Sequence, residues 1–168
     1  INLSHMPMAY VSLFVVAIVV AVGSGYFMTQ TYMSEIYFKK SIDAIRTNNG
    51  RDVYTNLQKA VQKAPYNEKY RSQFAQVNLL LANNIAQQKD MTDDQRRAAA
   101  QFIQQSIAEA KSLVALNPNR ASNWNTLAVI YRNIINVAQG ADAWTIASYQ
   151  EAIKHDPANP LLQLNLGG

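Results

Sequence analysis

The chain has 168 residues, of which 49% are apolar and only 15% are charged, and its formal net charge at pH 7 is +4. No Asp, Glu, Lys or Arg lies in residues 1–34, so all of the charge belongs to the rest of the chain. A mild positive charge without a block of Lys and Arg disfavours nucleic-acid binding. The absence of cysteine excludes disulfides, thiolate metal sites and cysteine nucleophiles.

A charge-free apolar segment covers residues 9–28. As a helix it would span about 30 Å, which is the thickness of the hydrocarbon core of a bilayer. A buried core helix of this length would normally carry a polar face, and a cleaved signal peptide would need a basic start, which residues 1–7 lack. We therefore predict one transmembrane helix within residues 1–33. Aromatic residues flank the segment, as in the aromatic belts of membrane helices: Tyr10, Tyr26, Phe27 and Tyr32.

Small residues recur on one face of this predicted helix, at Ala17, Ala21 and Gly25. Small side chains at this spacing let two helix backbones approach closely in lipid, so another transmembrane helix is an expected partner. The alternative is a chance distribution of Ala and Gly. Lys39 and Lys40 follow the span and nothing basic precedes it, which indicates a cytoplasmic C-terminal side.

The rest of the chain, residues 34–168, reads as helices separated by Asn, Pro and Gly, without a run of alternating β-branched residues or a hairpin signal. Three of its prolines have similar neighbours, in residues 63–67, 116–119 and 155–159. Each proline ends an apolar-periodic segment and is followed by another. This recurrence predicts a repeated pair of helices.

The segment from Asn123 to Pro157 resembles a tetratricopeptide repeat (TPR). Its first helix has an aromatic residue, a leucine, an alanine and a tyrosine at the spacing of that family, and its second helix has an aromatic residue and an alanine before the final proline. Thr145 departs from the alanine expected there. The resemblance implies an all-α, right-handed solenoid of helix pairs. The residues that carry it are Trp124, Leu127, Ala128, Tyr131, Tyr149, Ala152 and Pro157.

Counting from the prolines predicts units at residues 34–67, 68–119 and 120–159 and a truncated fourth unit from residue 160. The first helix would run straight on from the membrane span and end at residues 48–50, because Asn and Gly tolerate the left-handed conformation. The second unit would have helices at residues 68–88 and 92–116, the latter opened by a capping box at Thr92. Because the sequence begins with Ile and ends inside an unfinished unit, we expect it to be part of a longer protein.

Residues 65–168 also resemble the TPR tail of bacterial membrane proteins with several spans that are related to O-antigen ligases. The resemblance depends on four short motifs, at residues 65–71, 123–132, 139–144 and 156–160. It implies a location in the bacterial cytoplasmic membrane, with the side of the repeat domain open. In that group the ligase chemistry would lie in upstream membrane helices, so the resemblance transfers no catalytic residue to this chain.

The sequence contains no convincing constellation for chemistry. His5 and His155 have no second His nearby, and there is no Gly-rich phosphate loop and no nucleophile elbow. Capping explains the pair Asp93 and Asp94, and a loop turn explains Asp142. We expect no catalytic residue, no metal site and no cofactor in this part of the protein.

The TPR resemblance implies a binding groove lined by the first helices of the units. A protein or peptide is the expected partner, since amides and guanidinium groups hydrogen-bond well to an extended chain or a carboxylate. A solvated, amide-rich face is the alternative. The candidate groove residues are Lys69, Ser72, Gln76, Ser122, Asn125, Val129, Arg132 and Asn133.

Three functions are consistent with these features. The first is a membrane-anchored TPR scaffold that recruits protein partners and has no catalytic activity in this part of the chain, with membrane lipid around its anchor. The second is the accessory TPR region of a multi-spanning glycan ligase or polymerase. The third is a structural tail that self-associates through the small-residue face of the membrane helix.

Overall fold

The computed structural model describes residues 8–167, which form seven α-helices and no β-strand. The predicted all-α fold is therefore confirmed. Residues 1–7 and 168, with His5 and the N-terminal flank of the predicted span, lie outside the described residues. In chain order the helices are α1 (Met8–Arg46), α2 (Gly50–Lys63), α3 (Glu68–Ala86), α4 (Asp93–Leu116), α5 (Ala121–Asn133), α6 (Ala141–His155) and α7 (Pro160–Gly167).

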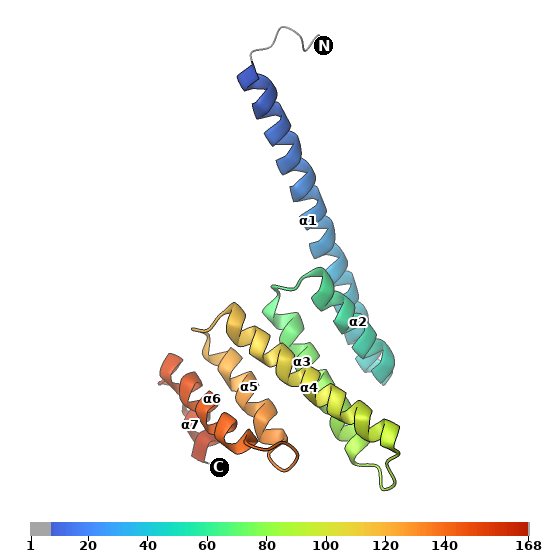
Figure 1. The fold of residues 1–168 in the computed structure, drawn as a ribbon, viewed down its shortest axis with the longest axis vertical. Coiled ribbons are helices and arrows are strands. Elements are labelled where there is room, and N and C mark those ends of the chain that lie inside the picture. The colour runs from blue at the N-terminus through green and yellow to red at the C-terminus, as the bar shows by residue number, and fades with distance from the viewer. Residues whose placement is uncertain (1–7, 168) are drawn as a thin grey trace.

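The helices after the first half of α1 form a row of antiparallel pairs (Figure 1). The second half of α1 pairs with α2, α3 pairs with α4, α5 pairs with α6, and α7 packs on α6. The first half of α1 projects from this body as a single stem. Such a row arises because one helix pair cannot bury its own apolar face and must place it against a neighbouring pair.

The 39-residue helix α1 combines two segments of different character. Its most apolar stretch has a mean hydropathy of 2.3 and is not buried against any other part of the structure. Its second half is amphipathic, since Ser34, Phe38, Ser41 and Ala44 recur at helical spacing and are buried. The helix continues without a break from one segment to the other, as the sequence predicts.

The turn between α1 and α2 differs in detail from the prediction. Asn48 takes the left-handed conformation, with φ of 53°, in the turn that follows the end of α1. Gly50 does not end α1 but begins α2. Asn49 caps α2, because its Oδ1 accepts a hydrogen bond of 3.1 Å from the backbone N–H of Asp52.

Three prolines end the second helices of the pairs in the same way. Ala64, Asn117 and Asp156 each precede a proline and have backbone angles outside the helical region, because proline disfavours the helical conformation in the residue before it. Each of these residues still donates its N–H to the carbonyl four positions earlier, and its own carbonyl accepts from the N–H three positions later. The repeated sequence motif is therefore a repeated turn that reverses the chain into the next pair.

The core forms two clusters of buried side chains that meet at α3. The first cluster joins α1, α2 and α3 and contains Leu57 and Phe74, and the second joins α3, α4, α5 and α6 and contains Ala75 and Leu127. Burial of each large apolar side chain stabilises the fold by about 1.5–3 kcal/mol. Completely buried alanines at the helix crossings let the helix backbones lie close together: Ala60, Ala75, Ala110, Ala128 and Ala152.

Candidate functional site

The first helices of the second and third pairs, α3 and α5, carry all eight candidate groove residues. A polar network holds the beginnings of these two helices together. The Asn123 Nδ2 group donates hydrogen bonds to Glu68 Oε2 at 2.9 Å and to the Leu113 carbonyl at 2.9 Å. The Arg120 guanidinium forms an ion pair of 3.2 Å with the same Glu68 carboxylate. The network fixes the relative position of α3 and α5, and thus of the candidate surface.

Sequence reasoning did not identify this network. Asn123 occupies the apolar stripe of its helix, in register with Leu127, Ile130 and Ile134, and all four side chains are buried. A polar residue at such a position needs a partner, since an unsatisfied buried amide is costly. The position of Asn123 in an apolar stripe therefore indicates a buried hydrogen bond, but the sequence does not identify Glu68 as its partner.

On α3, the candidate residues Lys69, Ser72 and Gln76 follow one face of the helix. The Gln76 amide donates a hydrogen bond of 3.3 Å to the Ser72 hydroxyl. The Lys69 ammonium lies 4.6 Å from the centre of the Phe38 ring of α1, a cation–π arrangement. Lys69 and Gln76 are exposed and Ser72 is half-buried, so this face is open to a ligand.

On α5, the candidate residues Ser122, Asn125, Val129 and Arg132 also follow one face, and Asn133 lies beside it. The Asn133 amide donates a hydrogen bond of 2.7 Å to the Val129 carbonyl, so it is partly used within its own helix. The Oδ1 atom of Asn125 is buried and has no hydrogen-bond partner among the described residues. A buried acceptor of this kind is typically satisfied by an ordered water.

The Arg132 side chain lies over an aromatic ring of α6, the second helix of its pair. Its guanidinium carbon lies 5.8 Å from the centre of the Tyr149 ring on α6. Burial raises the pKa of the Tyr149 phenol, and the charge of Arg132 opposes that rise. The Tyr149 hydroxyl is buried without a partner among the described residues. Arg132 therefore packs on an aromatic ring while its side chain remains exposed.

Buried aromatic contacts connect α3 to α1. The rings of Phe38 and Tyr70 stack with their centres 4.6 Å apart, and the Tyr70 hydroxyl donates a hydrogen bond to the Glu35 carboxylate. Burial raises the pKa of Tyr70, and the hydrogen bond and negative charge of Glu35 raise it further. These contacts join the helix that carries the apolar stem to the helix that carries Lys69.

The TPR signature residues contribute to packing. Leu127, Ala128 and Tyr131 on α5 are buried, as are Tyr149 and Ala152 on α6. Trp124 is half-buried, with its indole N–H donating a hydrogen bond of 2.7 Å to the Pro118 carbonyl. Pro157 lies exposed in the turn after α6.

Several residues of the four motifs at 65–71, 123–132, 139–144 and 156–160 make contacts between helices. The Arg71 guanidinium forms an ion pair with Glu109 across α3 and α4, and its Nε donates a hydrogen bond of 2.6 Å to the Pro65 carbonyl. Trp144 stacks on Tyr131, with ring centres 6.0 Å apart. These contacts stabilise the helix pairs. A structural role therefore accounts for Arg71 and Trp144.

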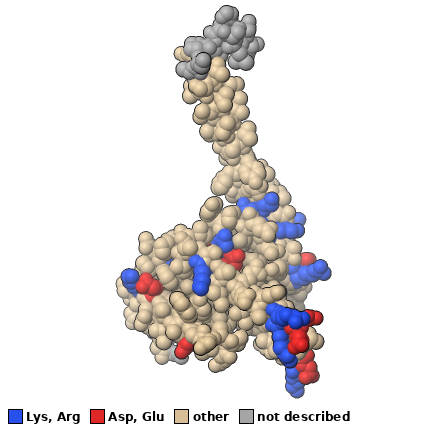
Figure 2. Space-filling model, viewed as in Figure 1, with Lys and Arg blue, Asp and Glu red and all other residues tan. Residues whose placement is uncertain are grey.

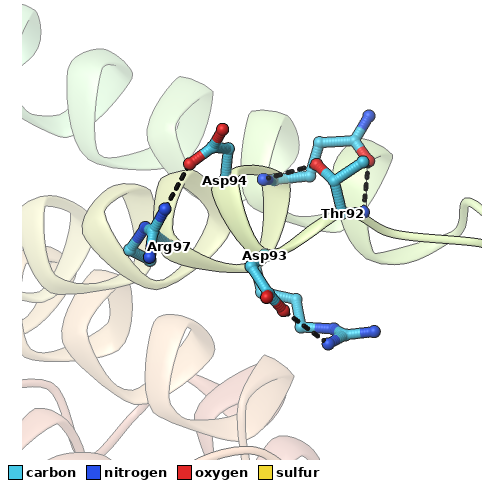
Figure 3. A network of polar contacts seen from close by, with 6 residues as sticks. Thr92, Asp93, Asp94 and Arg97 are labelled. Atoms are coloured by element: carbon cyan, nitrogen blue, oxygen red, sulfur yellow. Dashed lines mark hydrogen bonds and ion pairs between the residues drawn. The ribbon is translucent and has the colours of Figure 1, made fainter.

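The acidic residues considered as possible sites are part of helix N-termini. At the start of α4 the Thr92 hydroxyl accepts from the Gln95 N–H at 3.2 Å, and the Gln95 side chain accepts from the Thr92 N–H at 2.9 Å, which confirms the predicted capping box. Figure 3 shows this box together with Asp94, which forms an ion pair with Arg97. Asp142 does not lie in a loop turn, as the sequence suggested, but in the first turn of α6.

Acidic side chains stabilise a helix when they lie near its N-terminus, because the helix dipole is positive there. A structural role therefore accounts for Asp93, Asp94 and Asp142. Among residues 8–167, no group of three or more His, Cys, Asp or Glu side chains is placed to hold a metal ion.

A small apolar cleft that the sequence did not reveal lies between α4, α5 and α6. Its volume is about 370 Å³, and Trp124 and Trp144 form part of its wall. The Lys111 ammonium lies 5.7 Å from the centre of the Trp144 ring at one edge of the cleft. The cleft depends on α4 and α6 being neighbours in space, which no local sequence pattern specifies.

Comparison with a solved TPR domain identifies the fold. The chain is similar to the TPR domain of Arabidopsis OM64, with a TM-score of 0.58 and 12% sequence identity. The match covers 81% of this chain and 93% of that domain. The MamA protein is similar over 80% of this chain and 79% of its own, with a TM-score of 0.34 and 15% identity. No protein-family model matches the sequence. The curated proteins also give no match. The chain thus has the fold of a TPR α-solenoid.

Proposed function

We propose that this chain is a membrane-anchored scaffold whose TPR domain binds an extended segment of a protein partner. The observation that carries the proposal is the continuity of α1. One uninterrupted helix carries an exposed, charge-free apolar segment directly into the first helix pair of a TPR solenoid. This arrangement suits a protein that holds a binding domain at a bilayer surface.

The environment of the apolar segment supports an anchor. Its large side chains, from Tyr10 to Met28, are exposed in the structure, and monomeric soluble proteins rarely expose so continuous an apolar surface. The hydroxyls of Ser24 and Thr29 donate hydrogen bonds to the carbonyls four residues earlier, at 2.7 and 2.9 Å. These side chains therefore satisfy their own hydrogen bonds within the helix, as lipid requires.

The anchor is tested by placing a charge in its middle. Val16→Arg should reduce the membrane-bound fraction of the chain after alkaline extraction, because an arginine at the centre of a membrane helix costs about 2.5–3.5 kcal/mol. Arg at the exposed position Gln88, in the loop after α3, is the matched control. A chain that is extracted equally with and without Val16→Arg would refute the anchor.

The face of α3 and α5 supports peptide binding. It combines an exposed ammonium at Lys69, an exposed guanidinium at Arg132 and the half-buried amide side chain of Asn125. The two charges suit a carboxylate, and the amide suits the N–H and C=O groups of an extended backbone. The Glu68 network holds both helices in fixed positions, so this ligand surface is preorganised.

The candidate face on α3 and α5 is tested by replacing Asn125 and Arg132 together with alanine and measuring partner capture by cross-linking in native membranes. We expect capture to fall at least tenfold, the equivalent of about 1.4 kcal/mol. Arg97→Ala is the matched control, because it removes an exposed arginine of α4 outside the candidate face. Unchanged capture by the double variant would show that the partner binds elsewhere.

A second candidate function is the accessory TPR region of a multi-spanning glycan-assembly enzyme in the bacterial cytoplasmic membrane. It is supported by the resemblance of residues 65–168 to the TPR tail of such proteins, and it would place another membrane helix against Ala17, Ala21 and Gly25, where a Cβ built at Gly25 would meet nothing within 4 Å. A second transmembrane helix can therefore pack closely there. Replacing the three residues with leucine should then abolish cross-links between α1 and other spans. Retained cross-links would leave this face without a packing role.

A further inference from the structure

A hollow lies where the apolar stem of α1 meets the rest of the structure. Its volume is about 630 Å³. One wall is α1 from Tyr26 to Thr31, where the apolar segment gives way to Thr29, Gln30 and Thr31. The other wall is the end of α2 and the turn into α3, residues 62–67. The hollow therefore lies at the level where the apolar side chains of the stem end.

The chemistry of the lining combines exposed aromatic rings with one cation. Tyr26, Phe27 and Tyr66 are 68%, 67% and 77% exposed, although each is large and partly apolar. Lys63 is the only charged residue of the lining, and no carboxylate accompanies it. The remaining polar lining residues supply amide and hydroxyl groups: Gln30, Thr31, Gln62 and Asn67.

The distribution of charge on the whole surface is consistent with this position. Figure 2 shows that the stem carries no Lys, Arg, Asp or Glu on the face in view, and that Lys and Arg atoms begin where the stem meets the body. Lys63 is at the C-terminal end of α2, the end nearer to the stem (Figure 1). A basic residue at the cytoplasmic surface of a bilayer is attracted to anionic headgroups.

Resting on the membrane anchor proposed above, we propose that this hollow binds the phosphate headgroup of an anionic phospholipid. Lys63 pairs with the phosphate, and the side-chain amides of Gln30, Gln62 and Asn67 donate hydrogen bonds to its oxygens. Tyr26 and Tyr66 lie among the headgroups, where aromatic rings with one apolar and one polar end are stabilised, and the apolar ring of Phe27 faces the acyl chains. The bound lipid bridges α1 and the turn before α3.

This contact has a consequence for the groove. Because α1 is continuous and its second half packs on α2, the stem and the first helix pair form one unit. A lipid bound between the stem and residues 62–67 adds a second attachment to the bilayer. Two attachments restrict the tilt of the solenoid, so the face on α3 and α5 is presented at a defined angle to the membrane.

The test uses the full chain in nanodiscs that contain phosphatidylglycerol with a photoreactive diazirine on its headgroup. Lipid adducts are mapped by mass spectrometry of chymotryptic peptides. We expect adducts in residues 62–67, and we expect excess phosphatidylglycerol to compete for them better than phosphatidylcholine. Lys63→Gln should lower the adduct yield about fivefold, the contribution expected of one lysine near an anionic surface. Lys63→Arg should retain the yield.

Two controls make the result specific. Lys89→Gln removes an exposed lysine from the loop after α3, at the opposite end of the body from the stem, and should leave the adducts unchanged (Figure 1). Because the chain has no cysteine, Val16→Cys can be labelled alone, and a water-soluble maleimide reports whether the stem lies in lipid.

The outcomes separate the headgroup site from the anchor. A protected Val16→Cys with adducts that Lys63→Gln lowers supports the site. A protected Val16→Cys with adducts that are equally frequent at residues 87–92, or unaffected by Lys63→Gln, refutes the site and leaves the anchor intact. A Val16→Cys that reacts freely in nanodiscs refutes the anchor, and the headgroup site with it.

Discussion

The ion pair between Arg71 and Glu109 provides a sharp test of how the second helix pair is held together. The two side chains are only 17% and 16% exposed, and they join α3 to α4. Arg71 also donates to the Pro65 carbonyl at 2.6 Å, which connects the pair to the turn after α2. The perturbation is the replacement of Arg71 by methionine, which keeps the length of the side chain and removes its charge and its donors.

The expected loss follows from what remains after the replacement. Glu109 would be left as a largely buried carboxylate without its partner, and removal of one partner of a buried pair typically costs about 3–5 kcal/mol. Replacing Glu109 by leucine in the same chain removes that unpaired charge. The Pro65 carbonyl still lacks its donor, which costs about 1 kcal/mol. The double variant should therefore recover about 2–4 kcal/mol of the loss caused by Arg71→Met.

The assay is urea unfolding of the full chain in detergent, followed by circular dichroism, with amide hydrogen exchange to localise the loss to α3 and α4. Arg96→Met is the matched control, because Arg96 pairs with Asp93 in an exposed position and such pairs contribute about 0–1 kcal/mol. If Arg71→Met lowers the free energy of unfolding no more than Arg96→Met does, the pair is not structural and the reasoning from burial is wrong.

Three further predictions concern single side chains. Tyr149→Phe should raise the free energy of unfolding by about 1 kcal/mol, because it removes a buried hydroxyl without a partner. Burial raises the pKa of the Tyr149 phenol, so its ionisation favours the unfolded chain: the free energy of unfolding is unaffected by this group below the ordinary pKa of 10.0 and falls as pH rises from there through the higher folded value. Tyr149→Phe should weaken that alkaline loss in denaturation curves at several pH values. Ala128→Leu should cost about 1–3 kcal/mol in the same assay because Ala128 on α5 is completely buried, whereas Ala143→Leu, at an exposed position, should cost almost nothing. Thr92→Ala should cost about 1 kcal/mol and increase amide exchange in the first turn of α4; equal exchange in both chains would show that the capping box does not stabilise that turn.

Features set by neighbouring residues could be predicted from the sequence. The ends of the second helices follow from Ala64, Asn117 and Asp156, because the proline after each one disfavours the helical conformation locally. The capping box at Thr92 depends on a residue three positions later, and the apolar character of the stem depends on a run without charge. For such features the physical cause lies within a few residues, so the sequence contains it.

Contacts between distant segments could not be predicted in this way. Arg71 and Glu109 are 38 positions apart, and Asn123 and Glu68 are 55 apart. The periodicity of each helix predicts which face is buried, but it does not identify the residue that this face meets. The cleft beside Trp144 is lined by α4, α5 and α6, and the hollow beside Lys63 is lined by α1 and residues 62–67. Neither exists until the helices have packed.

The candidate groove shows both contributions. The sequence alone determined which residues share a face of α3 and of α5, because helical spacing places Lys69 with Gln76 and Asn125 with Arg132. Only the tertiary structure decided what surrounds them. It packs Arg132 against a ring on α6, places Lys69 over a ring on α1 and leaves the Asn125 acceptor without a partner among the described residues. The physical reason is that the geometry of one helix fixes which of its side chains share a face, whereas the residues that this face contacts depend on how the other helices pack around it.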